Sequence, residues 1–211
     1  GVLAVEMAVE DFGKQVLGKP IAVVSADHQN KADVGVAIAR KWFEAEQTDM
    51  VVGLGNSAVA LAVQQLAKEK NHIDIVSGAA STELTGKQCS PTGIHWTYDT
   101  HALAAGTTSA VMETGGDSWF FLTADYAFGY SLQESAADVV KSHGGKILGQ
   151  VRHPLNAADF SSYLLQAQAS KAKIIGLADA GGDTIVAVKQ AAEFGIGRKG
   201  QDQRLVALLL Q

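Results

Sequence analysis

Four short stretches of the sequence combine small, hydroxyl, amide and acidic residues at the point where an apolar run gives way to a helical pattern. In open parallel sheets, ligands bind at the carboxyl ends of the strands, where the following helices begin. Unpaired backbone N–H groups and the helix dipole at these helix starts favour an anionic group such as a carboxylate. The four stretches are GLGNSA (53–58), SGAASTEL (77–84), TADYAFGY (123–130) and LADAGGDT (177–184).

Most residues in these stretches also have a purely structural interpretation. The side chains of Asn56, Ser57, Ser81, Thr82 and Asp183 suit helix N-caps, and the glycines suit tight turns. None of the stretches carries the dinucleotide fingerprint or the phosphate loop with its lysine, so we expect no nucleotide site.

Two aromatic residues in the third stretch are harder to assign to a turn. Tyr126 and Phe128 lie inside a polar strand-to-helix connection. Such rings either pack against a neighbouring loop or face a ligand, and their spacing leaves both interpretations open.

The sequence gives little support for catalysis. Asp99, Asp125, Asp179 and Asp183 lie at loop or strand ends, where two of them could act as general acid and base. Helix caps and hinge contacts explain these acids more simply. The six histidines lack the close spacing of a zinc site, and no G-x-S-x-G elbow is present. We therefore expect no catalytic residue, no metal and no cofactor, and the protein is predicted not to be an enzyme.

Apolar residues alternate between helical and strand patterns along the whole chain. Strands that alternate with helices of about 10–15 residues predict βαβ units, with parallel sheets covered on both faces. Helices are expected at 2–12, 32–46, 57–70, 101–114, 130–144, 160–170 and 184–195. Strands are expected at 21–27, 49–55, 72–78, 118–124, 146–152, 173–179 and 204–210.

The order of elements in the first half of the chain, which ends near Asp99, resembles that in the second half. One sheet with this many strands would be unusually wide, so two smaller α/β domains explain the pattern better. We place the break in IHWTYDT (94–100), which gives an N-terminal domain of residues 1–98 and a C-terminal domain of residues 99–211.

The charge and composition limit the class of partner. The chain carries 17 basic and 22 acidic residues, a net charge of −5, and no basic run, which argues against a nucleic acid partner. No apolar stretch approaches the roughly 20 residues that span a bilayer, and the start GVLAVEMAVEDF lacks the basic leader of a secretion signal. The single cysteine, Cys89, forms no disulfide within the chain and is interpreted as a buried or idle thiol.

Four motifs occur in the same order as in a known family: the helix start NSAVALAV, the loop SGAASTELTG, the crossover HWTYDT and the turn TADYAFG. With them, essentially the whole chain resembles the type I periplasmic solute-binding proteins of ABC importers, most closely the branched-chain amino acid (Leu/Ile/Val-type) receptors. The resemblance implies two doubly wound parallel-sheet lobes joined by a hinge, which close on a small carboxylate. It also implies a membrane permease as partner, a monomer, and a periplasmic or lipid-anchored extracytoplasmic location.

The resemblance further implies which residues meet the ligand. The loop 77–84 would hold the ligand carboxylate. Ala80 stands where many relatives have threonine, so the threonine hydroxyl is either absent here or replaced by that of Ser81. Phe128 would cover the ligand from the second lobe. Small residues at Ala178 and Ala180, where amino acid receptors often carry tyrosine, would leave room for an aromatic or otherwise bulky acid. The full set is Asn56, Ser57, Ala79, Ala80, Ser81, Tyr98, Asp99, Tyr126, Phe128, Ala178 and Ala180.

Compared with the family, the chain is expected to be incomplete at both ends. Family members begin with a strand and a glycine-rich ligand loop before the first helix, and they continue beyond the last strand. The acid that often binds a ligand ammonium group would then lie beyond Gln211. Two alternatives stay open: a ligand-sensing regulator of the same fold, which would normally add a helix-turn-helix segment, and a small α/β enzyme that uses Asp99 or Asp125.

Overall fold

The structure, a computed structural model, describes residues 1–198 and 202–210. Its helices are α1 (Val2–Phe12), α2 (Ala32–Glu44), α3 (Ser57–Lys70), the 3₁₀ turn η1 (Thr82–Leu84), α4 (Thr100–Glu113), α5 (Ala127–Ser142), α6 (Ser161–Ala169) and α7 (Gly181–Glu193). Its strands are β1 (Gln15–Val16), β2 (Lys19–Pro20), β3 (Met50–Gly53), β4 (Ile73–Val76), β5 (Gly93–His95), β6 (Ser118–Ala124), β7 (Lys146–His153), β8 (Ile174–Ala178) and β9 (Arg204–Ala207).

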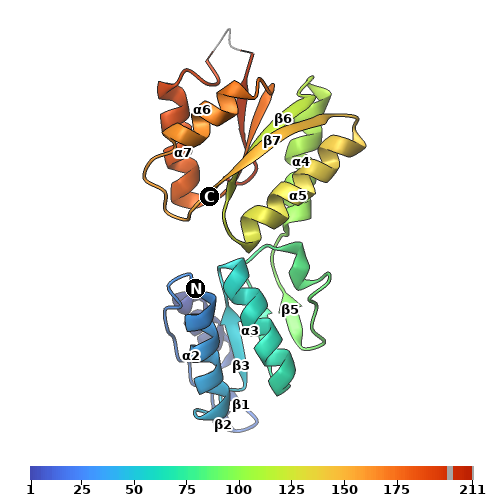
Figure 1. Cartoon of the computed structure of the whole chain (residues 1–211). Helices are drawn as coiled ribbons and strands as arrows, with labels where there is room; N and C mark the ends of the chain where they lie inside the picture. The colour runs from blue at the N-terminus through green and yellow to red at the C-terminus, as the bar shows by residue number, and fades with distance from the viewer. Residues whose placement is uncertain (199–201, 211) are drawn as a thin grey trace.

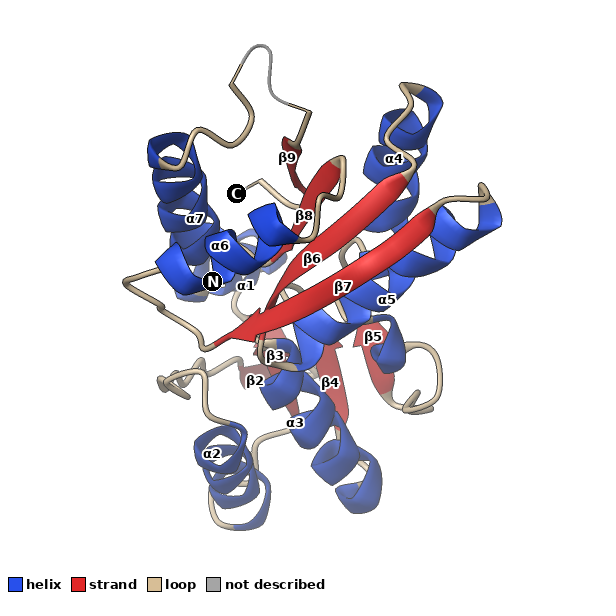
Figure 2. Ribbon diagram, turned by 45° about the horizontal axis from the view of Figure 1, so that its top comes forward, coloured by secondary structure: helices blue, strands red, loops and turns tan. Residues whose placement is uncertain are grey.

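The larger sheet has the strand order β7-β6-β8-β9, and all its strands are parallel. Successive residues of its central strand β6 point to opposite faces. Trp119 and Phe121 pack with α4 and α5, whereas Phe120 and Leu122 pack with α6 and α7. Figure 2 shows these helix pairs on either side of the sheet. Coverage of both faces explains why SWFFLTA is apolar without alternation, and each such side chain contributes about 1.5–3 kcal/mol on burial.

The smaller parallel sheet has the order β3-β4-β5. Val51 and Val76 are buried on the face that carries the α2 and α3 cores. On the other face, the apolar side chains of Met50, Val52, Ile73 and Ile94 remain 39–46% exposed. The prediction of coverage on both faces is therefore confirmed for the larger sheet and wrong for the smaller one within the described residues.

Helix α3 shows how the local sequence sets up the edge of the smaller sheet. SAVALAVQQLAKEK contains no glycine or proline, and Asn56 accepts hydrogen bonds from the first N–H groups of the helix. Lys68 and Lys70 lie in the last turn, and Asn71 ends the helix in the left-handed conformation. The helix therefore begins directly after the strand end, with Ser57 as its first residue.

Several sequence predictions need correction. Residues 21–27 form no strand, because no neighbouring strand pairs with them among the described residues, and an unpaired run has no ladder to hold it. The short strand β5 lies where the sequence suggested only a crossover, and α5 begins three residues before the predicted start at 130. Helix α1 is present as predicted, but none of its residues is buried.

Figure 1 shows the two sheets in separate parts of the molecule, with the chain passing from one to the other between β5 and α4. Three hydroxyl groups connect the parts. The Thr100 hydroxyl lies 2.6 Å from the Ser131 hydroxyl, and the Thr82 hydroxyl lies 3.0 Å from it. The Thr100 N–H also donates to the Ala80 carbonyl. The strand ends of the smaller sheet thus lie against the start of α5.

Candidate functional site

A cavity of about 50 Å³ lies where strand ends from both sheets approach each other. Its walls come from all four stretches that the sequence singled out, together with Tyr98 and one residue beyond β9. The lining residues are Gly55, Ser57, Gly78, Ala80, Tyr98, Tyr126, Phe128, Ala180 and Leu209. Six of the eleven predicted ligand residues are therefore brought together around one cavity.

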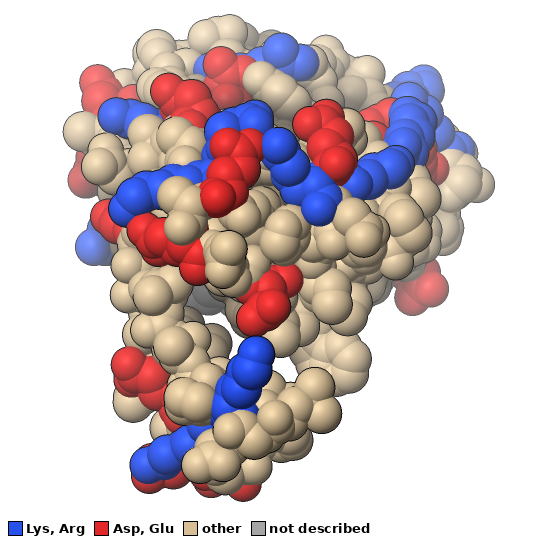
Figure 3. Space-filling view, turned by 90° about the horizontal axis from the view of Figure 1, so that it is seen from below, with Lys and Arg blue, Asp and Glu red and all other residues tan. Residues whose placement is uncertain are grey.

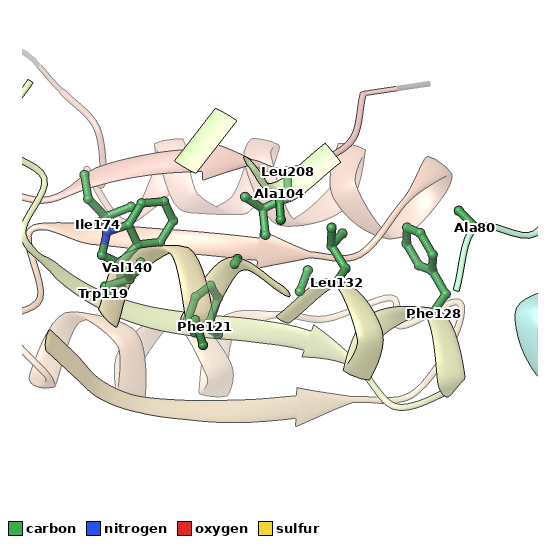
Figure 4. Close-up of a cluster of buried hydrophobic side chains, with 12 residues drawn as sticks. Ala80, Ala104, Trp119, Phe121, Phe128, Leu132, Val140, Ile174 and Leu208 are labelled. Carbon is green, nitrogen blue, oxygen red and sulfur yellow. The ribbon is translucent and has the colours of Figure 1, made fainter. Parts of the chain in front are cut away.

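The aromatic wall depends on a close contact between β6 and α5. A Cβ on Gly129 would overlap the carbonyl oxygen of Ala124, so only glycine lets the helix start this close to the strand end. This places Phe128, which is 5% exposed, against Ala80, as Figure 4 shows. The rings of Tyr126 and Phe128 lie 5.9 Å apart. Phe128 thus both packs against a neighbouring loop and lines the cavity.

Hydrogen bonds between the two loops of the smaller sheet fix the opposite wall. The Asn56 side-chain oxygen accepts from the N–H groups of Ala58 and Val59, so its interpretation as an N-cap is confirmed. The Ser57 hydroxyl oxygen accepts from the Ser81 N–H at 3.3 Å. This contact holds the first turn of α3 against the loop that follows β4.

Five predicted residues do not line the cavity: Asn56, Ala79, Ser81, Asp99 and Ala178. Three of them cap helices: Asn56 as described above, Ser81 by accepting from the Glu83 N–H, and Asp99 by accepting from the Ala102 N–H. Ala178 is fully buried in β8, and the Ala79 carbonyl bonds the ring of His95. These residues do not face the cavity, but they stabilise the elements that form its walls.

Other expected caps have different partners. Thr82 does not cap a helix; it contacts Ser131. Asp183 does not cap α7 either, because its carboxylate accepts from the N–H groups of Asn156 and Ala157 in the loop after β7. Asp125 accepts from the Tyr130 hydroxyl. The sequence pattern could place these side chains at strand ends but could not identify their long-range partners.

Sequence reasoning missed three lining residues. A Cβ on Gly78 would lie 2.9 Å from the Cα of Gly55, so the close approach of the two loops requires glycine at position 78. In the sequence, the only indication of this contact is that both strand-end stretches contain a glycine. Leu209 was predicted to lie within a strand, but β9 ends two residues before it, and its place in the wall depends on tertiary contacts.

The electrostatics of the cavity centre on Tyr126. Burial, with the nearby carboxylates of Asp183 and Asp179, raises the pKa of Tyr126 to about 12. The phenol is therefore neutral at physiological pH and retains a hydroxyl proton that it can donate to a carboxylate.

A second hollow, of about 300 Å³, lies beside α5 and the edge strand β7. It is bordered mostly by polar side chains, including Arg152, whose guanidinium lies 4.5 Å from the centre of the Tyr130 ring. It contains none of the predicted ligand residues. The smaller cavity is therefore the better candidate of the two, because it joins the strand ends of both sheets and the larger hollow does not.

Other features of the described residues concern metals, thiols and membranes. Within residues 1–198 and 202–210, no three His, Cys, Asp or Glu side chains form a potential metal site, and no helix has the length and hydropathy to cross a bilayer. Cys89 is exposed, which rules out the buried thiol and leaves the idle one of the two expected alternatives. Figure 3 shows basic and acidic side chains interspersed on the face seen from below.

Comparisons with known proteins bear on the whole chain. Residues 1–211 match a family described as "Periplasmic binding protein". A periplasmic binding protein from Burkholderia mallei is 57% identical with a TM-score of 0.94, over 98% of this chain and 54% of that one. A branched chain amino acid ABC transporter periplasmic ligand-binding protein from Burkholderia xenovorans LB400 is 36% identical with a TM-score of 0.74, over 98% of this chain and 55% of that one.

More distant structures share the fold. A solute binding protein of an ABC transporter from Rhodopseudomonas palustris BisB5, in complex with 3,4-dihydroxy benzoic acid, is 22% identical with a TM-score of 0.83, over 97% of this chain and 55% of that one. A search of curated proteins found no match. The chain spans about half the length of the solved structures that it matches. The family match covers every residue and confirms the resemblance drawn from the sequence motifs: the chain belongs to the periplasmic binding protein family.

Proposed function

We propose that this protein is a solute-binding receptor of an ABC importer, which binds a small carboxylate between two lobes without chemical turnover. The single observation that carries the proposal is the cavity whose walls come from strand ends of both sheets. Family membership supports a binding role rather than an enzymatic one, and the relative that is 36% identical is described as part of a branched chain amino acid ABC transporter. The partner would be the membrane permease, and the protein would act as a periplasmic or lipid-anchored monomer.

The lobes would be residues 1–98 and 99–211, with the hinge between β5 and α4. The last strand of the smaller sheet ends at His95, and Asp99 caps the first helix that packs on the larger sheet. A cavity of about 50 Å³ is smaller than the roughly 150 Å³ that holds benzene in an engineered core, so a ligand of that size requires the lobes to separate. A ligand that touches both lobes then favours closure around it.

The walls favour a flat or branched apolar ligand with one carboxylate. Tyr98, Tyr126 and Phe128 supply aromatic surfaces, whereas Ala80 and Ala180 leave space. Helix N-termini and the Tyr126 hydroxyl supply donors for the carboxylate. Relatives of about 20% identity are described in complex with benzoate and hydroxybenzoates, which supports an aromatic acid beside the branched-chain amino acids as the cargo. We assign ligand contact to the six predicted residues that line the cavity, and support of its walls to the other five.

Thermal unfolding against a ligand panel tests this proposal. The purified protein is mixed separately with branched-chain amino acids (leucine, isoleucine, valine) and aromatic acids (benzoate, 4-hydroxybenzoate). We expect one of these two classes to raise the unfolding midpoint by several degrees. Methyl benzoate, which lacks the charge, is the matched control and should leave the midpoint unchanged. Equal shifts with acid and ester, or no shift with any acid, would contradict a carboxylate receptor.

The size of residue 180 should decide which acids fit. In Ala180→Tyr, the added ring fills the space beside Tyr126, so we expect affinity for benzoates to fall at least tenfold (about 1.4 kcal/mol) while leucine binding is retained. Isothermal titration measures both affinities. Ala192→Tyr, on the exposed side of α7, is the control and should bind like the wild type. Unchanged benzoate affinity in Ala180→Tyr would remove residue 180 from the proposed site.

A further inference from the structure

We propose that His153 and Asp179 form a buried imidazolium–carboxylate pair that fixes the Ala180 wall of the cavity and neutralises the acid beside it. His153 is the last residue of β7, and Asp179 directly follows β8. The two side chains are 1% and 0% exposed, respectively. The existence of the pair stands on its own geometry, whereas its effect on a ligand rests on the proposed function.

The two nitrogens of the His153 ring face different acceptors. The His153 Nδ1 atom lies 3.1 Å from the Pro154 carbonyl oxygen, which can only accept, so Nδ1 carries a proton. The Nε2 atom lies 3.5 Å from Oδ2 of Asp179. In a neutral ring with Nδ1 protonated, Nε2 would direct its lone pair at a carboxylate oxygen. A charged imidazolium instead sets opposite charges 3.5 Å apart.

The two oxygens of Asp179 have different surroundings. The Thr184 hydroxyl donates to Oδ1 of Asp179 at 2.6 Å. Neither Oδ2 of Asp179 nor Nε2 of His153 has a hydrogen-bond partner among the described residues, so the two atoms meet as a close charge contact. A buried carboxylate without a counter-charge is strongly disfavoured, so the imidazolium is the group that compensates it.

The groups around the ring favour the same state. Burial of the ring opposes its charge, but Asp179, the Pro154 carbonyl and Asp183 outweigh this effect and raise the pKa of His153. The rings of Phe160 and Tyr163 cover the imidazole, with centres 4.7 and 6.1 Å away. They exclude water from the pair and carry no charge.

Three further polar side chains lie in the neighbourhood of His153 and Asp179. The Tyr126 hydroxyl is close enough to Asp183 and Asp179 for both acids to raise its pKa. The side chains of Asp125 and Arg152 both contact Tyr130, not the His153 ring. His153 is therefore the basic group in contact with Asp179.

The pair connects the protonation of one histidine to the ligand site. Ala180, which lines the cavity, is the next residue after Asp179 and the N-cap of α7. When His153 loses its proton, Asp179 keeps an uncompensated negative charge next to Ala180 in the cavity wall, which disfavours an anionic ligand. Because the pKa of His153 is raised in the folded state, the charged pair is fully present below pH 6.5 and is lost as pH rises through the raised value.

Nuclear magnetic resonance of the histidine rings tests the pair directly on the 211-residue chain. We expect His153 to titrate above 6.5 in the wild type and below 6.5 in Asp179→Asn, where burial is no longer opposed. Asp125→Asn removes a nearby exposed acid and should leave the titration unchanged. A wild-type titration at or below 6.5, or one insensitive to Asp179→Asn, would overturn the proposal. The wild-type measurement remains decisive if the variant fails to fold.

Amide hydrogen exchange tests whether the pair positions the wall. In His153→Gln, exchange of residues 179–183 should accelerate at least tenfold relative to His143→Gln, which changes an exposed histidine at the end of α5. Equal exchange in the two variants would show that the pair does not hold the loop.

Ligand binding separates this inference from the proposed function. For an acid that binds in the panel, we expect the dissociation constant to rise about tenfold as pH passes upward through the His153 titration, and this dependence should vanish in Asp179→Asn. If no acid binds but the ring titrates as expected, the proposed function fails and the pair stands. If an acid binds with no dependence on the His153 titration, the pair has no role in binding.

Discussion

Replacing Gly129 with alanine will lower the free energy of unfolding by about 3 kcal/mol, because the new methyl group meets backbone rather than a flexible side chain. Its Cβ would overlap the Ala124 carbonyl oxygen and lie 3.0 Å from the carbonyl carbon. The start of α5 must then move away from β6. Phe128 and Tyr126 move with it, so the aromatic wall of the cavity is displaced. Urea unfolding measures the loss of stability.

The control for this variant is Gly106→Ala in α4. No atom lies within 4 Å of a Cβ at Gly106, and alanine in a helix is about 1 kcal/mol more favourable than glycine. We therefore expect Gly106→Ala to be neutral or stabilising. If both alanine variants behave alike, the close approach at Gly129 does not hold the turn.

The helices and most strands could be predicted because their apolar spacing is local information. The segment 57–70 has a cap, an uninterrupted helical pattern and basic residues in its last turn, and α3 spans the same residues. Within the run 118–124, residues 119–122 are consecutive apolar residues, as a strand covered on both faces requires, and β6 spans the run. Neither prediction depends on a distant partner.

Predictions failed where a distant partner decides the outcome. Residues 21–27 have the composition of a strand, but a strand exists only when a neighbour supplies its hydrogen bonds. Likewise, the apolar pattern of β3 and β4 is typical of a sheet that is buried on both faces, yet Met50 and Ile73 remain exposed. The spacing of apolar residues indicates which side chains favour burial, but it does not indicate which segment buries them.

The candidate site was predictable in outline for a similar reason. Strand ends of parallel sheets lie at one edge, so the four stretches were expected to meet, and they do. The roles of single residues were not predictable, because a hydroxyl or carboxylate at a strand end serves equally well as cap, clamp or ligand contact. The Asp183 carboxylate binds two N–H groups of the loop after β7, whereas Asn56 caps α3. The buried contact between His153 and Asp179 could not be predicted either, because the two residues are far apart in the sequence.

Asp74→Val will raise the free energy of unfolding at neutral pH by about 2 kcal/mol. Asp74 lies in β4 between Val51 and Gly93, is 0% exposed, and has no hydrogen-bond partner for either carboxylate oxygen among the described residues. Burial raises the pKa of Asp74 from 3.8 to about 6. That shift corresponds to about 3 kcal/mol, and solvent screening lowers the expected gain. Valine also suits a strand better than aspartate.

The pH dependence identifies the carboxylate as the cause. Since the folded pKa of Asp74 is raised, the unfolded state ionises first, and wild-type stability falls as pH rises from about 4 to above 6. Asp74→Val lacks this loss, so urea unfolding of the two proteins should differ little at pH 4 and most above pH 7. Asp49→Asn, which removes an exposed acid just before β3, should keep the wild-type dependence. If Asp74→Val keeps it as well, another buried group controls stability in this range.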